Sequence, residues 1–141
     1  MSERLEALFR AARSAMRRAY APYSGFRVGA AVIDETGALH VGCNVENAAY
    51  PVGTCAEAGA LAAMVGAGGT RVVEAAVVGG AEGDGILCTP CGACRQRLRE
   101  FAADDVPIHV CGPEGPRRTV TLGEILPLSF GPDNLAGGGP R

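Results

Sequence analysis

Hydrophobic residues recur at steps of three and four near the N-terminus. The residues on this stripe are Leu5, Leu8, Phe9, Ala12, Met16 and Ala19. This period is typical of an amphipathic helix, so a helix is predicted over residues 3 to 19, ended by Ala21-Pro22. Farther along, the apolar segments Val28 to Ile33 and Leu39 to Asn44 flank the polar stretch Asp34 to Gly37, and this pattern predicts a β-hairpin.

The middle of the chain alternates helical and extended patterns. After an irregular connection over residues 44 to 54, an alanine-rich stretch predicts a helix over Cys55 to Ala67 that is closed by glycines. Val72 to Val78 is a nearly continuous apolar run, which is typical of a strand buried on both faces. A glycine-rich loop over Gly79 to Gly85 follows, and Pro90 is predicted to open a second helix that runs through Phe101.

The C-terminal part is predicted to add two strands and a short helix. Ile108 to Cys111 is predicted to be a strand, Gly112 to Arg117 a loop, and the region around Val120 a short strand. Thr121 to Glu124 has the capping-box pattern of a brief helix. The order of elements predicts an α/β fold of three layers, α/β/α, with a mixed sheet of about five strands.

The length of 141 residues predicts a single domain. We expect this domain to span residues 1 to 135 and residues 136 to 141 to form a flexible tail.

Residue types that are absent or rare exclude several catalytic mechanisms. The chain has no lysine, which excludes Schiff-base and phosphate-loop lysines. His40 and His109 lie in apolar strand contexts without a catalytic-triad motif, so local structural partners are expected for both. A metal-activated water is therefore the most direct source of a nucleophile.

Charge and cysteine usage indicate the compartment and the substrate class. A formal charge of −2 and a pI near 5.7 argue against non-specific binding to nucleic acid and favour a small, neutral substrate. No apolar run reaches the length needed to span a membrane. Six unevenly spaced cysteines, behind an N-terminus without a signal-peptide core, predict reduced thiols in the cytoplasm.

Two short motifs carry the candidate chemistry. Cys55-Ala56-Glu57 and Pro90-Cys91-Gly92-Ala93-Cys94 supply three thiolates and leave the fourth position of a tetrahedral zinc open, beside a carboxylate. Cys91 and Cys94, three residues apart on a helix, share one face. Glu57 would lie about 200° around the helix from Cys55, so that helix must meet the metal end-on, with Cys55 near its cap.

Other interpretations of the same residues stay open at this point. Thr54 to Glu57 also matches a capping box, in which Glu57 would only start a helix. Cys91 and Cys94 could form a redox pair, or a closed structural zinc site that Cys88 or Cys111 completes.

The cysteine spacing leaves one further alternative. The spacing from Cys88 to Cys94 resembles part of an iron–sulfur ligand set. Cys43, Cys88 and Cys111 lie in apolar strand contexts, where buried, inert thiols are expected.

The two cysteine motifs together are far more specific than either motif alone. Cys-x-Glu followed by Pro-Cys-x-x-Cys is the all-cysteine form of the nucleobase deaminase signature. The chain resembles the small, homotetrameric class of cytidine deaminases over nearly its whole length. The segments that carry this likeness are YAPYSGFRVGAA at 20–31, GCNVENAAYP at 42–51, CGACRQ at 91–96 and LPLSFGP at 126–132.

The resemblance implies roles for individual residues. Cys55, Cys91 and Cys94 would hold one Zn²⁺ per subunit, and Glu57 would shuttle protons during hydrolytic deamination of cytidine and 2′-deoxycytidine. The implied substrate-binding residues are Phe26 and Phe130 at the pyrimidine, Asn44 and Glu46 at the ribose 3′-hydroxyl, Ala48 and Tyr50 near the 5′-hydroxyl, and the backbone around Ala56 at the base. Phe130, Ala48 and Tyr50 would act across subunit interfaces of a homotetramer.

One residue departs from the family pattern. Many members carry an arginine after the catalytic glutamate, where it offsets thiolate charge, and this chain has Ala58. Helix dipoles and another basic group such as Arg95 are expected to compensate. The departure also leaves room for a related substrate, either a nucleoside antibiotic or cytosine in single-stranded nucleic acid. A non-catalytic zinc or iron–sulfur module is the more distant alternative.

Overall fold

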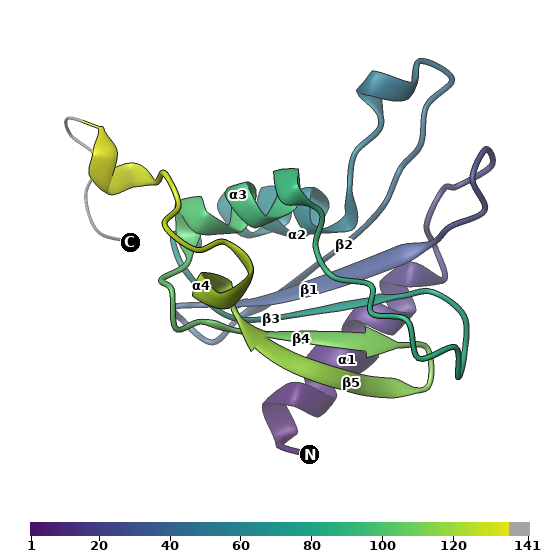
Figure 1. Ribbon diagram of the computed structural model, residues 1–141, viewed down its shortest axis with the longest axis horizontal. Helices are drawn as coiled ribbons and strands as arrows, with labels where there is room; N and C mark the ends of the chain where they lie inside the picture. The colour runs from purple at the N-terminus through teal and green to yellow at the C-terminus, as the bar shows by residue number, and fades with distance from the viewer. Residues whose placement is uncertain (136–141) are drawn as a thin grey trace.

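The computed structural model describes residues 1–135 and shows a three-layer arrangement (Figure 1). The middle layer is one five-stranded sheet with the strand order β2-β1-β3-β4-β5. The strands are β1 (Val28–Asp34), β2 (Leu39–Cys43), β3 (Val72–Gly79), β4 (Pro107–Gly112) and β5 (Gly115–Thr121). Only β3 and β4 pair in parallel, so the sheet is mixed.

The helices form the two outer layers. They are α1 (Glu3–Met16), α2 (Ala56–Gly66), α3 (Gly92–Phe101) and the short α4 (Leu122–Ile125), with 3₁₀ turns at Tyr50–Val52 and Pro132–Asn134. Helix α1 covers one face of the sheet, and α2 and α3 lie side by side on the other (Figure 1). The prediction of a three-layer α/β/α fold with a mixed sheet is confirmed.

The alternation of side chains along the strands separates the core into two parts. In β1, Ala30 and Val32 pack toward α2, whereas Ala31 and Ile33 pack toward α1. Successive residues of a strand point to opposite faces, so a strand covered on both faces is apolar at nearly every position. This explains the nearly continuous apolar run of β3, which Glu74 interrupts and whose apolar residues divide between the two clusters.

The predicted helices are close to those observed, with differences at their ends. Helix α1 ends at Met16, and the next residues continue as a tighter turn in which the Arg18 amide donates to the Ala15 carbonyl oxygen (2.9 Å). Helix α3 begins at Gly92 rather than at Pro90, because Cys91 is its N-cap. The capping box of α4 forms as predicted, with Thr121 and Glu124 bonded reciprocally.

Two predictions in the second half of the chain are wrong. The loop expected over Gly112 to Arg117 is shorter, because a tight hairpin pairs Gly112 with Gly115, where β5 begins. Cys88, expected in a strand, lies in an irregular segment. The Arg117 guanidinium holds this segment by donating to the carbonyl oxygens of Ile86 (2.6 Å) and Ala81 (2.8 Å), which satisfies polar groups that a strand would pair.

The predicted tail over residues 136 to 141 lies outside the described residues. Within residues 1–135, no helix is long and apolar enough to cross a membrane.

Candidate metal centre and substrate pocket

Three thiols converge where two helices begin. Cys55 is the N-cap of α2, Cys91 is the N-cap of α3, and Cys94 lies in the first turn of α3. Their sulfur atoms all lie within 4.8 Å of one another, and the Cys55 and Cys91 sulfurs are 3.9 Å apart. Among the described residues, neither Cys88 nor Cys111 belongs to this cluster.

The geometry and the donor types fit Zn²⁺. Two sulfurs bound to a tetrahedral zinc at about 2.3 Å lie about 3.8 Å apart, close to the separation of Cys55 and Cys91. Cys94 is fully buried, whereas Cys91 is exposed, so the cluster is closed on one side and open on the other. Three thiols with an open side favour a catalytic zinc site over a closed structural one.

The helix ends and burial act on the three thiols in opposite directions. Each helix N-terminus brings unpaired N–H groups and partial positive charge to the sulfurs. Partial burial raises the pKa of Cys91, but hydrogen bonds from the Cys94 backbone and from the neighbouring thiols outweigh burial and leave the pKa lowered. Burial raises the pKa of Cys55 and of Cys94. Cys91 is therefore the thiol that ionises most readily.

Glu57 lies in the first turn of α2 and is only 5% exposed. Burial raises its pKa above the usual range. A divalent cation at the sulfurs acts in the opposite direction and favours the carboxylate. Burial and a bound cation thus act on the Glu57 pKa in opposite directions, which suits a group that must both accept and donate a proton.

The capping-box interpretation of Glu57 is wrong. The Thr54 amide, which a capping box would pair with Glu57, donates to the Val45 carbonyl oxygen at 2.9 Å. The N-cap of α2 is Cys55, and no side-chain hydrogen bond caps this helix. Cys55 at the cap also meets the requirement that α2 approach the metal end-on.

A pocket of about 360 Å³, within the range of small-molecule sites, opens beside the thiols. Its lining combines the metal-binding motif with most of the residues predicted to bind substrate. These residues are Phe26, Asn44, Glu46, Tyr50, Ala56, Cys55, Glu57 and Cys91. Residues far apart in the sequence therefore form one site.

Two of the predicted substrate-binding residues lie outside this pocket. Ala48 is exposed on the loop before the 3₁₀ turn, and Phe130 is 59% exposed near the C-terminal end of the described chain. The Phe130 backbone is held by Gln96, whose side chain donates to the Phe130 carbonyl oxygen at 2.8 Å. Within one chain the structure does not bring these two side chains to the site.

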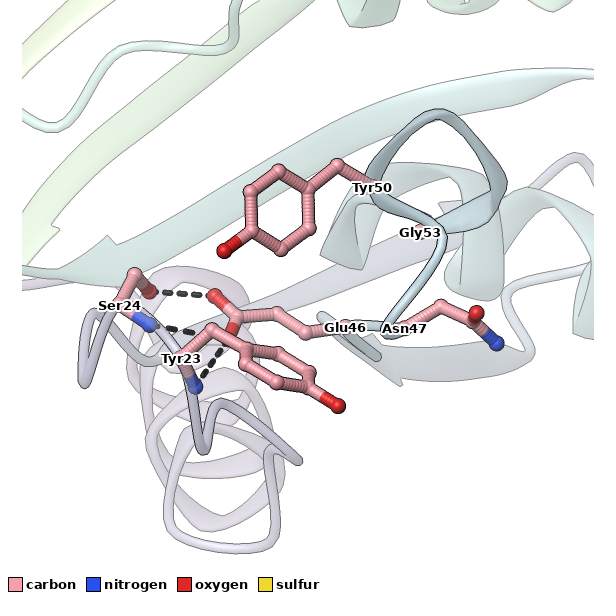
Figure 2. A pocket seen from close by; sticks show the side chains of 6 residues that line it. All are labelled: Tyr23, Ser24, Glu46, Asn47, Tyr50 and Gly53. Atoms are coloured by element: carbon pink, nitrogen blue, oxygen red, sulfur yellow. Dashed lines mark hydrogen bonds between the residues drawn. The ribbon is translucent and has the colours of Figure 1, made fainter.

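Glu46 lies in the wall that this pocket shares with an adjoining pocket of about 330 Å³, which Figure 2 shows. Its carboxylate accepts hydrogen bonds from the backbone amides of Tyr23 (2.9 Å) and Ser24 (3.1 Å) and from the Ser24 hydroxyl. These bonds lower the pKa of Glu46, the Ser24 hydroxyl most of all. The Tyr23 and Tyr50 rings meet edge to face, 5.8 Å apart, in the adjoining pocket.

Asn44 ties the adjacent loop to the sheet. Its side-chain oxygen accepts from the Val28 amide (2.8 Å), and its side-chain nitrogen donates to the Phe26 carbonyl oxygen (2.8 Å). An amide has two donors and two lone pairs, so one N–H and one lone pair remain for a ligand. Asn44 thus fixes the segment that carries Phe26 while keeping hydrogen-bonding capacity toward the pocket.

Sequence reasoning assigned no role to Ser24 or Thr89, which line the pocket. The sequence could have indicated Ser24, because it lies inside the segment 20–31 that carries part of the family resemblance. Arg95, named above as a candidate to offset the thiolate charge, has oxygen atoms as its partners. Its guanidinium donates to Pro90 (2.7 Å) and Ile125 (2.9 Å) carbonyl oxygens and to the Thr89 hydroxyl (3.2 Å), so Arg95 anchors the segment before Cys91.

The remaining thiols and both histidines have local surroundings. Of the three thiols expected to be buried, Cys111 is buried in the core beside α1, whereas Cys43 in β2 and Cys88 are only half-buried. Cys88 borders the pocket, and burial raises its pKa to about 11. His40 pairs with Asp34 (2.7 Å) and His109 with Glu74 (2.6 Å), as expected for structural histidines.

Comparisons with known proteins agree with this site. Residues 2–110 match the family model described as the cytidine and deoxycytidylate deaminase zinc-binding region. The chain is 37% identical over 132 residues to a cytidine deaminase of Sporosarcina psychrophila, covering 94% of this chain and 95% of that protein. It is 43% identical over 117 residues to a cytidine deaminase of Mycobacterium tuberculosis, covering 83% and 82%.

A solved structure agrees with the fold. The crystal structure of cytidine deaminase from Burkholderia pseudomallei superposes with a TM-score of 0.82 at 39% identity, covering 92% of this chain and all of that one. Sequence, fold and the cysteine motif thus point the same way. The chain belongs to the zinc-dependent cytidine deaminase family.

Proposed function

We propose that this protein catalyses the zinc-dependent hydrolytic deamination of cytidine and 2′-deoxycytidine to uridine and 2′-deoxyuridine, with release of ammonia, as a step of pyrimidine salvage. The observation that carries the proposal is the convergence of Cys55, Cys91 and Cys94 beside Glu57, in a pocket whose polar wall contains Asn44 and Glu46. The zinc centre and the sugar-binding groups therefore share one cavity.

Cys55, Cys91 and Cys94 would hold the zinc, which would lower the pKa of a bound water toward about 7. Glu57, buried beside the cluster, is the group that takes up and returns protons. Cytosine N3 needs a proton to make C4 electrophilic, and the exocyclic amine needs one to leave as ammonia. One carboxylate serves both atoms, because it acts first as base and then as acid.

The rest of the pocket selects a nucleoside. Asn44 offers a donor and an acceptor, and Glu46 offers an acceptor, which together suit the ribose 3′-hydroxyl. Phe26, which lines the pocket, would pack against the pyrimidine ring. The backbone around Ala56, at the start of α2, would form hydrogen bonds to the base. Tyr50, which also lines the cavity, is assigned with Ala48 to the 5′-hydroxyl.

We also propose a homotetramer with shared active sites. Several large apolar side chains are exposed near the pocket and in the C-terminal segment, among them Tyr50, Phe130 and Leu128. Burying such groups against another subunit is favourable. Ala48 and Phe130, which lie outside their own pocket, would then reach the pocket of a neighbour.

Two further assignments follow from the same residues. We propose that residues 1–135 act as a single catalytic domain, because one sheet carries both core clusters. A cytoplasmic location is consistent with six free cysteines, three of which must stay reduced to bind zinc.

The decisive experiment is the loss of ultraviolet absorbance when cytidine is added to wild type and to Glu57→Gln, each with its zinc content measured. We expect turnover in wild type and a loss of at least 100-fold in Glu57→Gln, with fold and zinc retained. No turnover of cytidine by zinc-loaded wild type, or full activity in the variant, would refute the proposal. Light scattering, which measures the mass of the assembly, tests the proposed tetramer in wild type and in Phe130→Ala.

A further inference from the structure

The metal centre carries an excess of negative charge. Three thiolates around one Zn²⁺ have a formal charge of −1, and ionised Glu57, itself buried, lines the pocket beside them. Uncompensated charge in a buried site is costly, so a nearby cation is expected. Ala58, the residue after Glu57, cannot supply it, and the guanidinium of Arg95 is engaged with oxygen atoms elsewhere.

Arg97 contacts one of the three sulfurs. Its Nη1 atom donates to the Cys94 sulfur at 3.5 Å. The two residues are three positions apart on α3, so their side chains share one face of the helix. Long helical side chains lean toward the helix N-terminus, and this direction carries the guanidinium of Arg97 back over the buried Cys94.

The second observation concerns the surface groove between α2 and α3. Its lining residues are Ala58, Leu61, Gln96, Arg97, Glu100 and Phe101. Ala58 and Arg97 therefore face the same space from opposite helices. The small side chain at position 58 leaves the groove open, and the guanidinium at position 97 lies within it.

We propose that Arg97 is the positioning residue that compensates the thiolate charge of this zinc centre, from α3, in place of a cation at position 58 on α2. This inference rests on the proposed function only in that zinc occupies the three-thiol site. A guanidinium remains charged at every accessible pH and donates to the sulfur at the same time, so it both offsets the charge and orients Cys94. Removal of such an outer partner of a metal ligand typically weakens metal binding about 10- to 100-fold.

The test is zinc affinity, measured by competition with a chromophoric chelator at fixed pH. Arg97→Leu is expected to bind zinc about 10- to 100-fold more weakly than wild type. The matched control is Arg10→Leu, an exposed helical arginine on α1 that pairs with Glu6 at 2.8 Å, and it should leave zinc affinity unchanged. Affinity of Arg97→Leu within twofold of wild type would overturn the proposal.

Two further variants separate charge from packing. Arg97→Lys, and Ala58→Arg combined with Arg97→Leu, each restore a cation to the groove, and at least one should recover part of the lost affinity. No recovery in either would overturn the proposal, because a cation in the groove would then not matter. The thermal midpoint of the zinc-free protein should be the same for Arg97→Leu and wild type. An equal loss in the zinc-free and zinc-loaded proteins would assign Arg97 to the fold and overturn the proposal.

These readouts are independent of catalysis. Failure of wild type to deaminate cytidine would refute the proposed function and leave the zinc affinities intact. Unchanged zinc affinity in Arg97→Leu beside an active wild type would refute only the assignment of Arg97.

Discussion

Gly42 of β2 lies directly against the backbone of Ala60 in α2. A Cβ atom at Gly42 would come within 2.3 Å of the Ala60 nitrogen and 2.4 Å of the Ala56 carbonyl oxygen. Real Cβ atoms do not approach backbone so closely, so only glycine lets α2 pack this near the sheet. The first turn of α2 carries Glu57 and follows Cys55. The distance between α2 and the sheet therefore determines where these two metal-site residues lie.

Gly42→Ala is expected to push α2 outward, to destabilise the fold by about 1–3 kcal/mol and to weaken zinc binding. The control is Gly66→Ala at the end of the same helix, where an added Cβ meets nothing within 4 Å. It should be neutral or slightly stabilising. Denaturant unfolding and zinc titration measure both effects, and equal behaviour of the two variants would contradict this explanation.

The metal centre is predicted to need three thiols and no fourth. Cys91→Ala should lose bound zinc, whereas Cys88→Ala should retain one zinc per chain, because Cys88 lies outside the cluster. Metal analysis of the purified variants by mass spectrometry measures the stoichiometry. Loss of zinc from Cys88→Ala would indicate a closed, four-thiol site.

Zinc binding should weaken as the pH falls. Burial raises the pKa of Cys55 and Cys94, so both are protonated at neutral pH without metal, and each must lose its proton to bind zinc. The stabilisation that zinc gives is therefore present at neutral and alkaline pH and lost toward acid. Calorimetric titration in two buffers of different ionisation enthalpy should show release of about two to three protons per zinc at pH 7. Proton release near zero would contradict this prediction, because the thiols would then be ionised before zinc binds or would not be the ligands.

Ser24→Ala should weaken substrate binding more than turnover. The Ser24 hydroxyl is the largest cause of the lowered pKa of Glu46 and holds its carboxylate in the pocket wall. Its loss should raise the Glu46 pKa and increase KM for cytidine about 10-fold, with kcat little changed.

Thr36→Ala is the matched control, because it removes another hydroxyl–carboxylate bond, from Thr36 to Asp34 (2.6 Å), in the turn between β1 and β2. It should leave KM unchanged. A Ser24→Ala enzyme with normal KM would show that Glu46 keeps its position without this bond.

Local sequence patterns determined a large part of the fold. Apolar periodicity located α1, because the side chains of one helix face recur at a fixed step. The alanine-rich stretch closed by glycines located α2, and Pro90 located the start of α3 to within two residues. The Thr121 and Glu124 pair located α4, since a capping box closes within one turn. The Cys-x-Glu and Pro-Cys-x-x-Cys motifs also identified the metal chemistry, because the ligand types and the local spacing lie in the sequence itself.

Tertiary structure decided which residues meet across long separations. Cys55 and Cys91 are 36 positions apart, and only the packing of α2 and α3 on one sheet face brings their sulfurs together. The pairing of the Thr54 amide with Val45 excludes a capping role for Glu57, although the local pattern allowed one. Tertiary structure likewise decided that Arg97, and not Arg95, donates to the Cys94 sulfur. Both arginines follow Cys94, and their reach depends on side-chain direction and neighbouring elements, which no local pattern encodes.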